Sequence, residues 1–199
     1  MPLRAPISHH LDLYGYWLAQ RARRAMPARS DLHLHDIPAL VPYLTIVDQI
    51  NGQFRYRLVG TAAVQQLGHD LTGSFVGSYV NTPHSATALR AIYERVFTSA
   101  HPIFATGEYN TKWGALLNIS QLILPLSDDG TNVNMVVYTR VARFSFDVTT
   151  SIGWLKGAPI KVCDVVDIAA AADLEKRCLE WERHSLPSNA PGKTIASEI

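Results

Sequence analysis

The sequence has little of what marks secreted, membrane-spanning or nucleic-acid-binding proteins. It contains 2 cysteines in 199 residues, and Cys163 and Cys178 have neither metal-binding nor redox spacing. No apolar run approaches the roughly 20 residues that span a bilayer, and the N-terminus lacks the apolar segment of a secretory signal. The formal net charge of +1 argues against non-specific binding to nucleic acid or to an anionic membrane. We therefore expect a cytoplasmic protein without a membrane or nucleic-acid partner.

Short motifs of the common enzyme classes are missing as well. The sequence has no Gly-x-Ser-x-Gly, no complete phosphate loop, no His-Glu-x-x-His, and no Gly-x-Gly-x-x-Gly after a strand. We expect a non-catalytic protein without a catalytic residue or a metal site, whose output passes through protein contacts.

What the sequence does contain is a strand and helix pattern around residues 51–73. Aromatic or aliphatic residues alternate with arginines from Phe54 to Val59, which indicates a half-buried strand. Asn51-Gly52 predicts a hairpin that joins this strand to one at 43–50. Gly60 then permits a sharp change of direction into a short helix.

The rest of the chain predicts an α+β protein. Thr82-Pro83 is typical of a helix start, and the segments after residue 102 are rich in the residues that strands prefer. We expect a five-stranded antiparallel sheet with helices across one face and flanking N- and C-terminal helices. The expected helices cover 11–26, 74–80, 83–99 and 165–184, and the expected strands cover 43–50, 53–59, 103–109, 113–124 and 133–144.

Four regions follow from this pattern. An N-terminal helix and connector occupy 1–38, and the core occupies 39–146. A C-terminal extension with a helix covers 147–186, and a polar tail covers 187–199.

The order and spacing of several segments resemble the PAS domain, and more narrowly the single-domain bacterial PAS family found largely in alphaproteobacteria. The matching segments are Tyr16-Trp17, Met26 to Asp31, Asp36-Ile37-Pro38, Phe54 to Thr61, Gly68 to Gly73, and Pro125-Leu126-Ser127 before Asp129-Gly130. The resemblance implies a sensory module with a pocket between the sheet and its covering helices. It also implies a homodimer formed through the helix at 11–26.

Such a pocket would be lined by aromatic side chains from the helices that cover the sheet. The candidates are Phe75, Tyr79, Tyr93 and Phe97, although aromatic stripes also serve simply to pack a core. Arg57 is a further candidate, because an arginine that pointed inward from this strand would need an anionic partner. If Arg57 pointed outward, it would be an ordinary solvated strand residue.

Trp113 and Asn118 are candidates on the predicted central strand. Asn118 and Gln121 are polar residues inside an apolar run, so a buried partner or a ligand would explain them. An outward position on the pleat would explain them equally well.

The sequence leaves the cofactor unknown. A haem would need an axial histidine, for which His84 and His101 are the candidates, and a light-sensing flavin would need a cysteine in the helical segment, which is absent. His33 and His35 could supply two zinc ligands, whereas a site needs three or four.

Two functions of different classes remain open. The first is a sensory protein that binds a small molecule or senses metabolic state and reports it through protein contacts. The second is an adaptor or scaffold whose core is filled by its own side chains. An enzyme on the same fold is a third, but the sequence offers no titratable cluster for it.

Overall fold

The computed structural model describes residues 7–80, 82–110, 116–144 and 160–185. In this part of the chain, six strands form one antiparallel sheet in the order β2-β1-β5-β4-β3-β6. The strands are β1 (Leu44–Ile50), β2 (Gln53–Val59), β3 (Ile103–Asn110), β4 (Leu116–Leu126), β5 (Met135–Phe144) and β6 (Ile160–Asp167). The predicted α+β class is confirmed, with six strands where five were expected.

The sixth strand lies where we expected the C-terminal helix to begin. Helical spacing of apolar residues suggested a helix over 165–184, but β6 runs to Asp167 and α4 (Ala171–Ser185) starts only after it. The segment is rich in β-branched valine, which favours strands, and it pairs with β3 from Ile103 to Tyr109. Part of the predicted extension 147–186 therefore belongs to the same sheet as the predicted core.

The other helices are α1 (Ser8–Arg21), α2 (Thr61–Leu67) and α3 (Pro83–Ser99). α3 has the predicted bounds, and its Thr82 cap accepts a hydrogen bond from the Ser85 amide at 3.2 Å. α1 is shorter at its C-terminal end than the predicted 11–26. The helix predicted over 74–80 is absent: this segment forms turns, and Phe75 bridges to Arg55 at the edge of β2.

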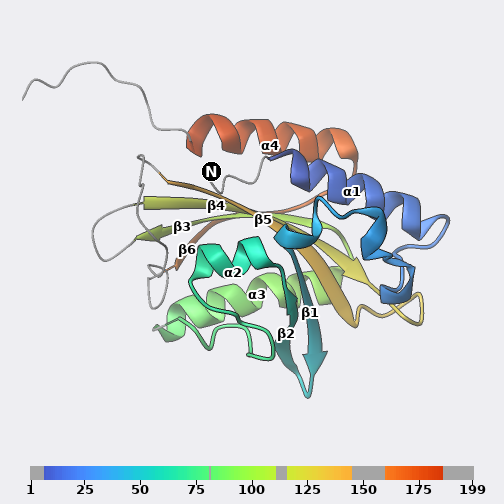
Figure 1. Cartoon of the computed structure of the whole chain (residues 1–199), viewed down its shortest axis with the longest axis horizontal. Helices are drawn as coiled ribbons and strands as arrows, with labels where there is room; N and C mark the ends of the chain where they lie inside the picture. Colours follow the sequence, from blue (N-terminus) through green and yellow to red (C-terminus); the bar gives the residue numbers. More distant parts are fainter. Residues whose placement is uncertain (1–6, 81, 111–115, 145–159, 186–199) are drawn as a thin grey trace, which may run out of the picture.

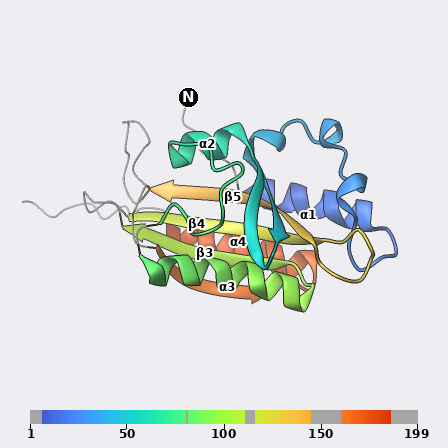
Figure 2. The same ribbon diagram turned by 90° about the horizontal axis from the view of Figure 1, so that it is seen from below.

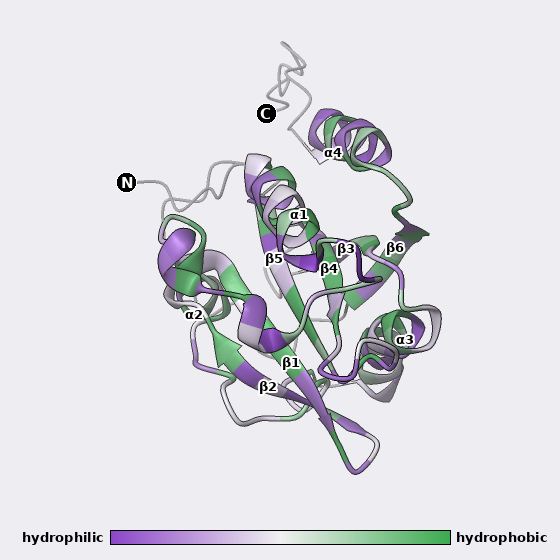
Figure 3. Ribbon diagram, turned by 90° about the vertical axis from the view of Figure 1, so that its right-hand side faces the viewer, coloured by the Kyte–Doolittle hydropathy of each residue, from purple (hydrophilic) through white to green (hydrophobic). Residues whose placement is uncertain are grey.

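Helices cover both faces of the sheet. α1 and α4 lie side by side on one face, called the outer face here, and α2 and α3 cover the inner face (Figures 1 and 2). Hydrophobic residues concentrate in the strands between these layers, whereas α4 alternates between hydrophilic and hydrophobic residues (Figure 3). The sheet therefore separates two cores, an inner core and an outer core.

The apolar face of α1 belongs to the outer core. Leu13, Tyr14 and Trp17 are buried against the sheet, and the Trp17 indole Nε1 donates a hydrogen bond to the Pro125 carbonyl at 2.8 Å. The helix that was expected to carry a dimer interface thus uses its largest apolar side chains within its own chain. No helix in the described part of the chain is long and apolar enough to cross a membrane.

Gly60 lies between β2 and α2. A glycine is needed there because backbone atoms of another segment lie very close to it, and not because of its backbone angles. Its φ of −63° and ψ of 152° are open to any residue. A Cβ atom at this position, however, would collide with the carbonyl groups of Pro42 and Val41. The short connection into α2 therefore depends on the missing side chain.

We expect Gly60→Ala to lower the free energy of unfolding by about 2–3 kcal/mol, because backbone atoms must move to admit the methyl group. Urea denaturation measures the change. Gly15→Ala is the matched control: Gly15 lies within α1, has open space around it, and should gain about 0.5–1 kcal/mol from the same substitution. Equal effects at the two sites would contradict the close packing at Gly60.

Candidate functional site

Five tyrosines from different segments converge on the inner core. They are Tyr56 of β2, Tyr79 of the turn segment 75–80, Tyr93 of α3, Tyr109 of β3 and Tyr138 of β5. Tyr79 is partly buried and the others are buried. Ring centres lie 6.3 Å apart for Tyr56 and Tyr79 and 6.2 Å apart for Tyr93 and Tyr138. The inner core therefore contains more hydroxyl groups than is usual for a hydrophobic core.

Arg140 lies among these tyrosines. It shares the inward face of β5 with Val136 and Tyr138, and it is 6% exposed. Its guanidinium carbon lies 5.5 Å from the centre of the Tyr109 ring, a cation–π distance. The Nε and Nη2 atoms are buried and have no hydrogen-bond partner among the residues that the structure describes. We call Arg140 and the five tyrosines the Arg140–tyrosine cluster.

The cluster carries a positive charge for which the described residues provide no matching carboxylate. Burial raises the pKa of all five phenols, so each remains protonated at neutral pH. Burial lowers the pKa of Arg140, and the nearby phenols of Tyr109, Tyr79, Tyr138 and Tyr56 raise it above its usual value. The protein therefore offers this guanidinium aromatic faces and neutral hydroxyls. Burying charged donors without partners costs free energy, and such groups are rare in native proteins.

Thr139 precedes Arg140 on β5, faces the outer core and contacts α1. Thr139 Oγ1 lies 2.7 Å from His10 Nδ1, and Ser120 Oγ of β4 lies 3.0 Å from His10 Nε2. The His10 side chain is fully buried, and burial lowers its pKa to about 3. The imidazole is therefore neutral and bridges two hydroxyls between α1 and the sheet.

A second buried arginine of β5 attaches α4 on the same outer face. The Arg143 guanidinium lies 5.9 Å from the Trp181 ring centre and 3.8 Å from the Glu182 carboxylate. One strand thus carries Arg140 into the inner core and holds both helices of the outer layer through Thr139 and Arg143.

Three of the aromatic residues predicted for a pocket lie together in the inner core. Tyr93 is buried there, and Tyr79 and Phe97 pack against it. Phe97 lies 4.9 Å from the Phe54 ring. Phe75 lies elsewhere: it is 40% exposed at the edge of β2.

The sequence left open whether Arg57 points inward or outward, and in the structure it points outward. It is exposed and pairs with Asp48 at 3.4 Å, while Arg55 binds the same carboxylate more closely. Burial alone would raise the pKa of Asp48, but hydrogen bonds and charges from both arginines bring it below its usual value. Arg57 therefore has an anionic partner within the protein and lies outside the Arg140–tyrosine cluster.

The two polar residues predicted on β4 lie on opposite faces. Leu117 and Ile119 point into the inner core, so Asn118 between them points to the outer face, where it is half-buried. Gln121 falls on the inner face, directly opposite Arg140 in the β4–β5 register. Trp113 lies outside the described residues.

Sequence reasoning missed Arg140, Tyr56, Tyr109 and Tyr138 as site residues. A signal existed in β5, because its apolar residues occupy both parities of the strand. A strand of that kind is buried on both faces, so an arginine inside it has no solvated position. Arg57 differs because it lies on β2, an edge strand where solvent is available to an arginine.

The candidate cofactor ligands do not gather at the cluster. His84 and His101 are both exposed. Cys178 lies in the outer core, and Cys163 is exposed on β6. The rings of His33 and His35 lie 5.6 Å apart, but no three His, Cys, Asp or Glu residues within the described ranges form a group that could hold a metal ion.

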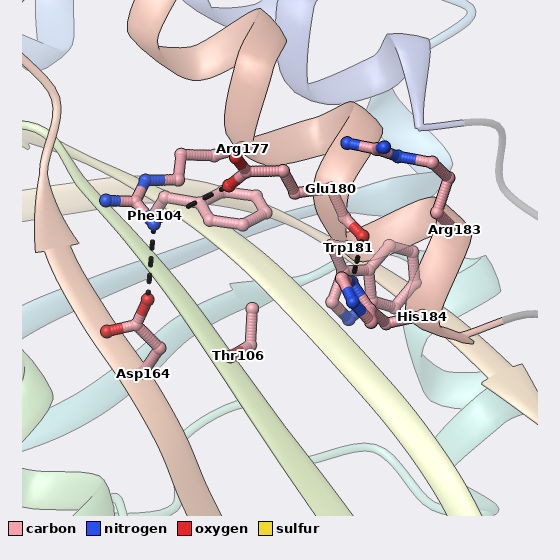
Figure 4. A pocket seen from close by; sticks show the side chains of 8 residues that line it. All are labelled: Phe104, Thr106, Asp164, Arg177, Glu180, Trp181, Arg183 and His184. Atoms are coloured by element: carbon pink, nitrogen blue, oxygen red, sulfur yellow. Dashed lines mark hydrogen bonds and ion pairs between the residues drawn. The ribbon is translucent and has the colours of Figure 1, made fainter.

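A separate groove of about 410 Å³ lies on the outer face between α4 and the strands β3 and β6. Figure 4 shows Arg177 of α4 at this groove, between the carboxylates of Asp164 and Glu180. Both distances are 3.7 Å. Because these charges neutralise one another, the groove gives weaker evidence for a ligand than the Arg140–tyrosine cluster does.

Comparison with known proteins identifies the family. A family model described as a PAS domain matches residues 7–137. The chain belongs to the PAS domain family. PAS domains are sensory domains. In this chain, the sheet has the strand order β2-β1-β5-β4-β3 with β6 added at the edge, and the Arg140–tyrosine cluster lies on its inner face. No curated protein matches the chain.

The solved structures to which the chain is similar are distant in sequence. The light-oxygen-voltage protein of Rhodobacter sphaeroides is 12% identical, with 55% of this chain and 65% of that chain covered and a TM-score of 0.43. VqmA of Vibrio cholerae, solved with a ligand and DNA, is 13% identical, with 60% and 54% covered and a TM-score of 0.43. The PAS domain of Bordetella pertussis BvgS is 13% identical, with 75% and 97% covered and a TM-score of 0.32.

We expect Tyr93→Ala to lower the free energy of unfolding by about 3–5 kcal/mol, because it removes a fully buried ring from the inner core. Phe75→Ala should cost about 1 kcal/mol or less, since Phe75 is 40% exposed at the edge of the sheet. Chemical denaturation of both variants tests this difference. Similar losses at the two positions would contradict their placement.

The buried His10 should make stability depend on pH. The unfolded chain binds a proton below about pH 6.5, whereas folded His10 resists protonation down to about pH 3. Its contribution is complete above pH 6.5 and is lost as the pH falls toward 3, at up to about 1.4 kcal/mol per pH unit. Unfolding of His10→Gln should therefore show a shallower slope than wild type from about pH 6 to about pH 4.

The control for this measurement is His35→Gln, because the His35 side chain is 81% exposed. This variant should keep the wild-type slope. If His10→Gln also kept it, the buried neutral imidazole would be refuted.

Proposed function

We propose that this protein is a non-catalytic sensory PAS protein that holds a small molecule between its sheet and the α2–α3 layer. The observation that supports this most is the Arg140–tyrosine cluster. A core built for stability alone would use apolar residues, which carry no polar atoms that need partners. Here a guanidinium and five phenols come from β2, β3, β5, α3 and the turn segment 75–80.

The signal would leave through the opposite layer. Thr139 and Arg140 are adjacent on β5 and face opposite cores, so a ligand that shifts the strand at Arg140 also shifts the contact between Thr139 and His10. Arg143 attaches α4 to the same strand. We propose that a protein partner reads the positions of α1 and α4.

The remaining parts of the proposal rest on the sequence. They are a cytoplasmic location, a bacterial source and a homodimer that involves α1. The burial of Leu13, Tyr14 and Trp17 means that such a dimer would use the other side of α1.

Native mass spectrometry and thermal unfolding of the full chain with a metabolite panel would test the sensory function. We expect either a small molecule retained after purification or a compound that raises Tm by about 3 °C at five times its Kd. Ala105→Leu should weaken this binding, because Ala105 lies in the inner core and a larger side chain takes up space there.

Leu179→Ser is the matched control, because Leu179 is 54% exposed on α4 and lies away from the inner core. It should bind the compound as wild type does. If no molecule were retained and no compound stabilised the protein, the adaptor with a self-filled core would replace the sensor.

A further inference from the structure

Among the described residues of the inner core, Arg140 is the polar side chain without a full set of hydrogen-bond partners. It is 6% exposed, and its Nε and Nη2 atoms lack hydrogen-bond partners among the described residues. The tyrosines around it are uncharged at neutral pH. A buried guanidinium in this situation calls for an anion that the described residues do not supply.

The Nε and Nη2 atoms are the pair through which an arginine donates two hydrogen bonds to one carboxylate. The same chain shows this geometry at Arg55, whose Nε donates to Asp48 Oδ1 at 3.1 Å and whose Nη2 donates to Asp48 Oδ2 at 2.7 Å. Two parallel hydrogen bonds of this kind are the characteristic bidentate contact between arginine and a carboxylate. Arg140 presents the same pair of donors, and neither has a partner among the described residues.

The residues around Arg140 favour a ligand with a single negative charge and an aromatic or apolar remainder. In the described part of the chain, Arg140 is the one buried lysine or arginine on the inner face, since the buried Arg143 lies on the outer face. One guanidinium balances one charge, which matches a monocarboxylate better than a phosphate dianion. The Tyr109 ring lies 5.5 Å from the guanidinium, and ring faces pack well against flat apolar groups.

We infer that the ligand of this domain is a small organic monocarboxylate, held through its carboxylate by Nε and Nη2 of Arg140 with its body against the surrounding tyrosine rings. This inference rests on the proposed sensory function, because it names the ligand class of the same site. Gln121, opposite Arg140 on β4, is placed to add a hydrogen bond from its amide.

The test compares two arginine variants with wild type, using benzoate and phenylacetate as probes and their neutral amides, benzamide and phenylacetamide, as matched controls. Arg140→Met removes the anchor, and Arg55→Met removes an arginine that already has a carboxylate partner. Thermal unfolding and calorimetric titration of the full chain supply the Tm and Kd. Inorganic phosphate serves as a probe of anion binding without an organic body.

We expect the carboxylates to raise the Tm of wild type and of Arg55→Met, by about 3 °C at five times the Kd. The amides and phosphate should have much smaller effects. Arg140→Met should lose at least about 30-fold in carboxylate affinity. Without ligand, Arg140→Met should melt above wild type, because methionine carries no unpaired buried charge.

Two other results would overturn the inference in different ways. If the amides stabilise wild type and Arg140→Met as well as the carboxylates do, a small molecule binds but its charge is irrelevant, so the proposed function survives alone. If no probe stabilises wild type and ligand-free Arg140→Met melts below it, Arg140 serves the fold, and both the inference and the interior binding site are refuted.

Discussion

The burial of both faces of β5 is the constraint on which the rest of the structure depends. Successive side chains of a strand point to opposite faces, and here each face is covered by helices. No position near the middle of β5 is therefore solvated, so a polar residue there must find its partners within the protein or in a ligand. Thr139 finds them in His10, whereas two donors of Arg140 find none among the described residues.

The two cores have different chemical characters. The outer core holds α1 and α4 against the sheet with large apolar side chains and a few satisfied polar contacts, such as Trp17 with Pro125 and His10 with Thr139 and Ser120. The inner core mixes apolar residues with phenols and a guanidinium. Satisfied polar networks rigidify a core, while an unpaired buried polar group costs free energy. The sheet between them connects a candidate binding site to a layer that a partner could contact.

Most of the fold could be predicted because its signals are local. Asn51 and Gly52 have φ angles of 50° and 77°, as a tight hairpin with these residues requires, and Thr82-Pro83 marks the start of α3. The errors arose where local signals were ambiguous. The segment at 160–167 resembles a strand or a helix by composition alone, and only pairing with β3 decides between them. The turn segment with Phe75 is likewise determined by its contact with the edge of β2.

The candidate site shows the same division. Helical spacing predicted Tyr93 and Phe97 on one apolar side of α3, and both lie at the inner core. The sequence left the direction of Arg57 on β2 open. By itself, the sequence determined the α+β class, the hairpin and these local faces, because they depend on residues a few positions apart. Tertiary structure alone decided that Arg140 lies near tyrosines from β2, β3 and the turn segment, and that Arg57 pairs with Asp48. Those contacts join residues far apart in the chain, and they depend on strand order and on which face each helix covers.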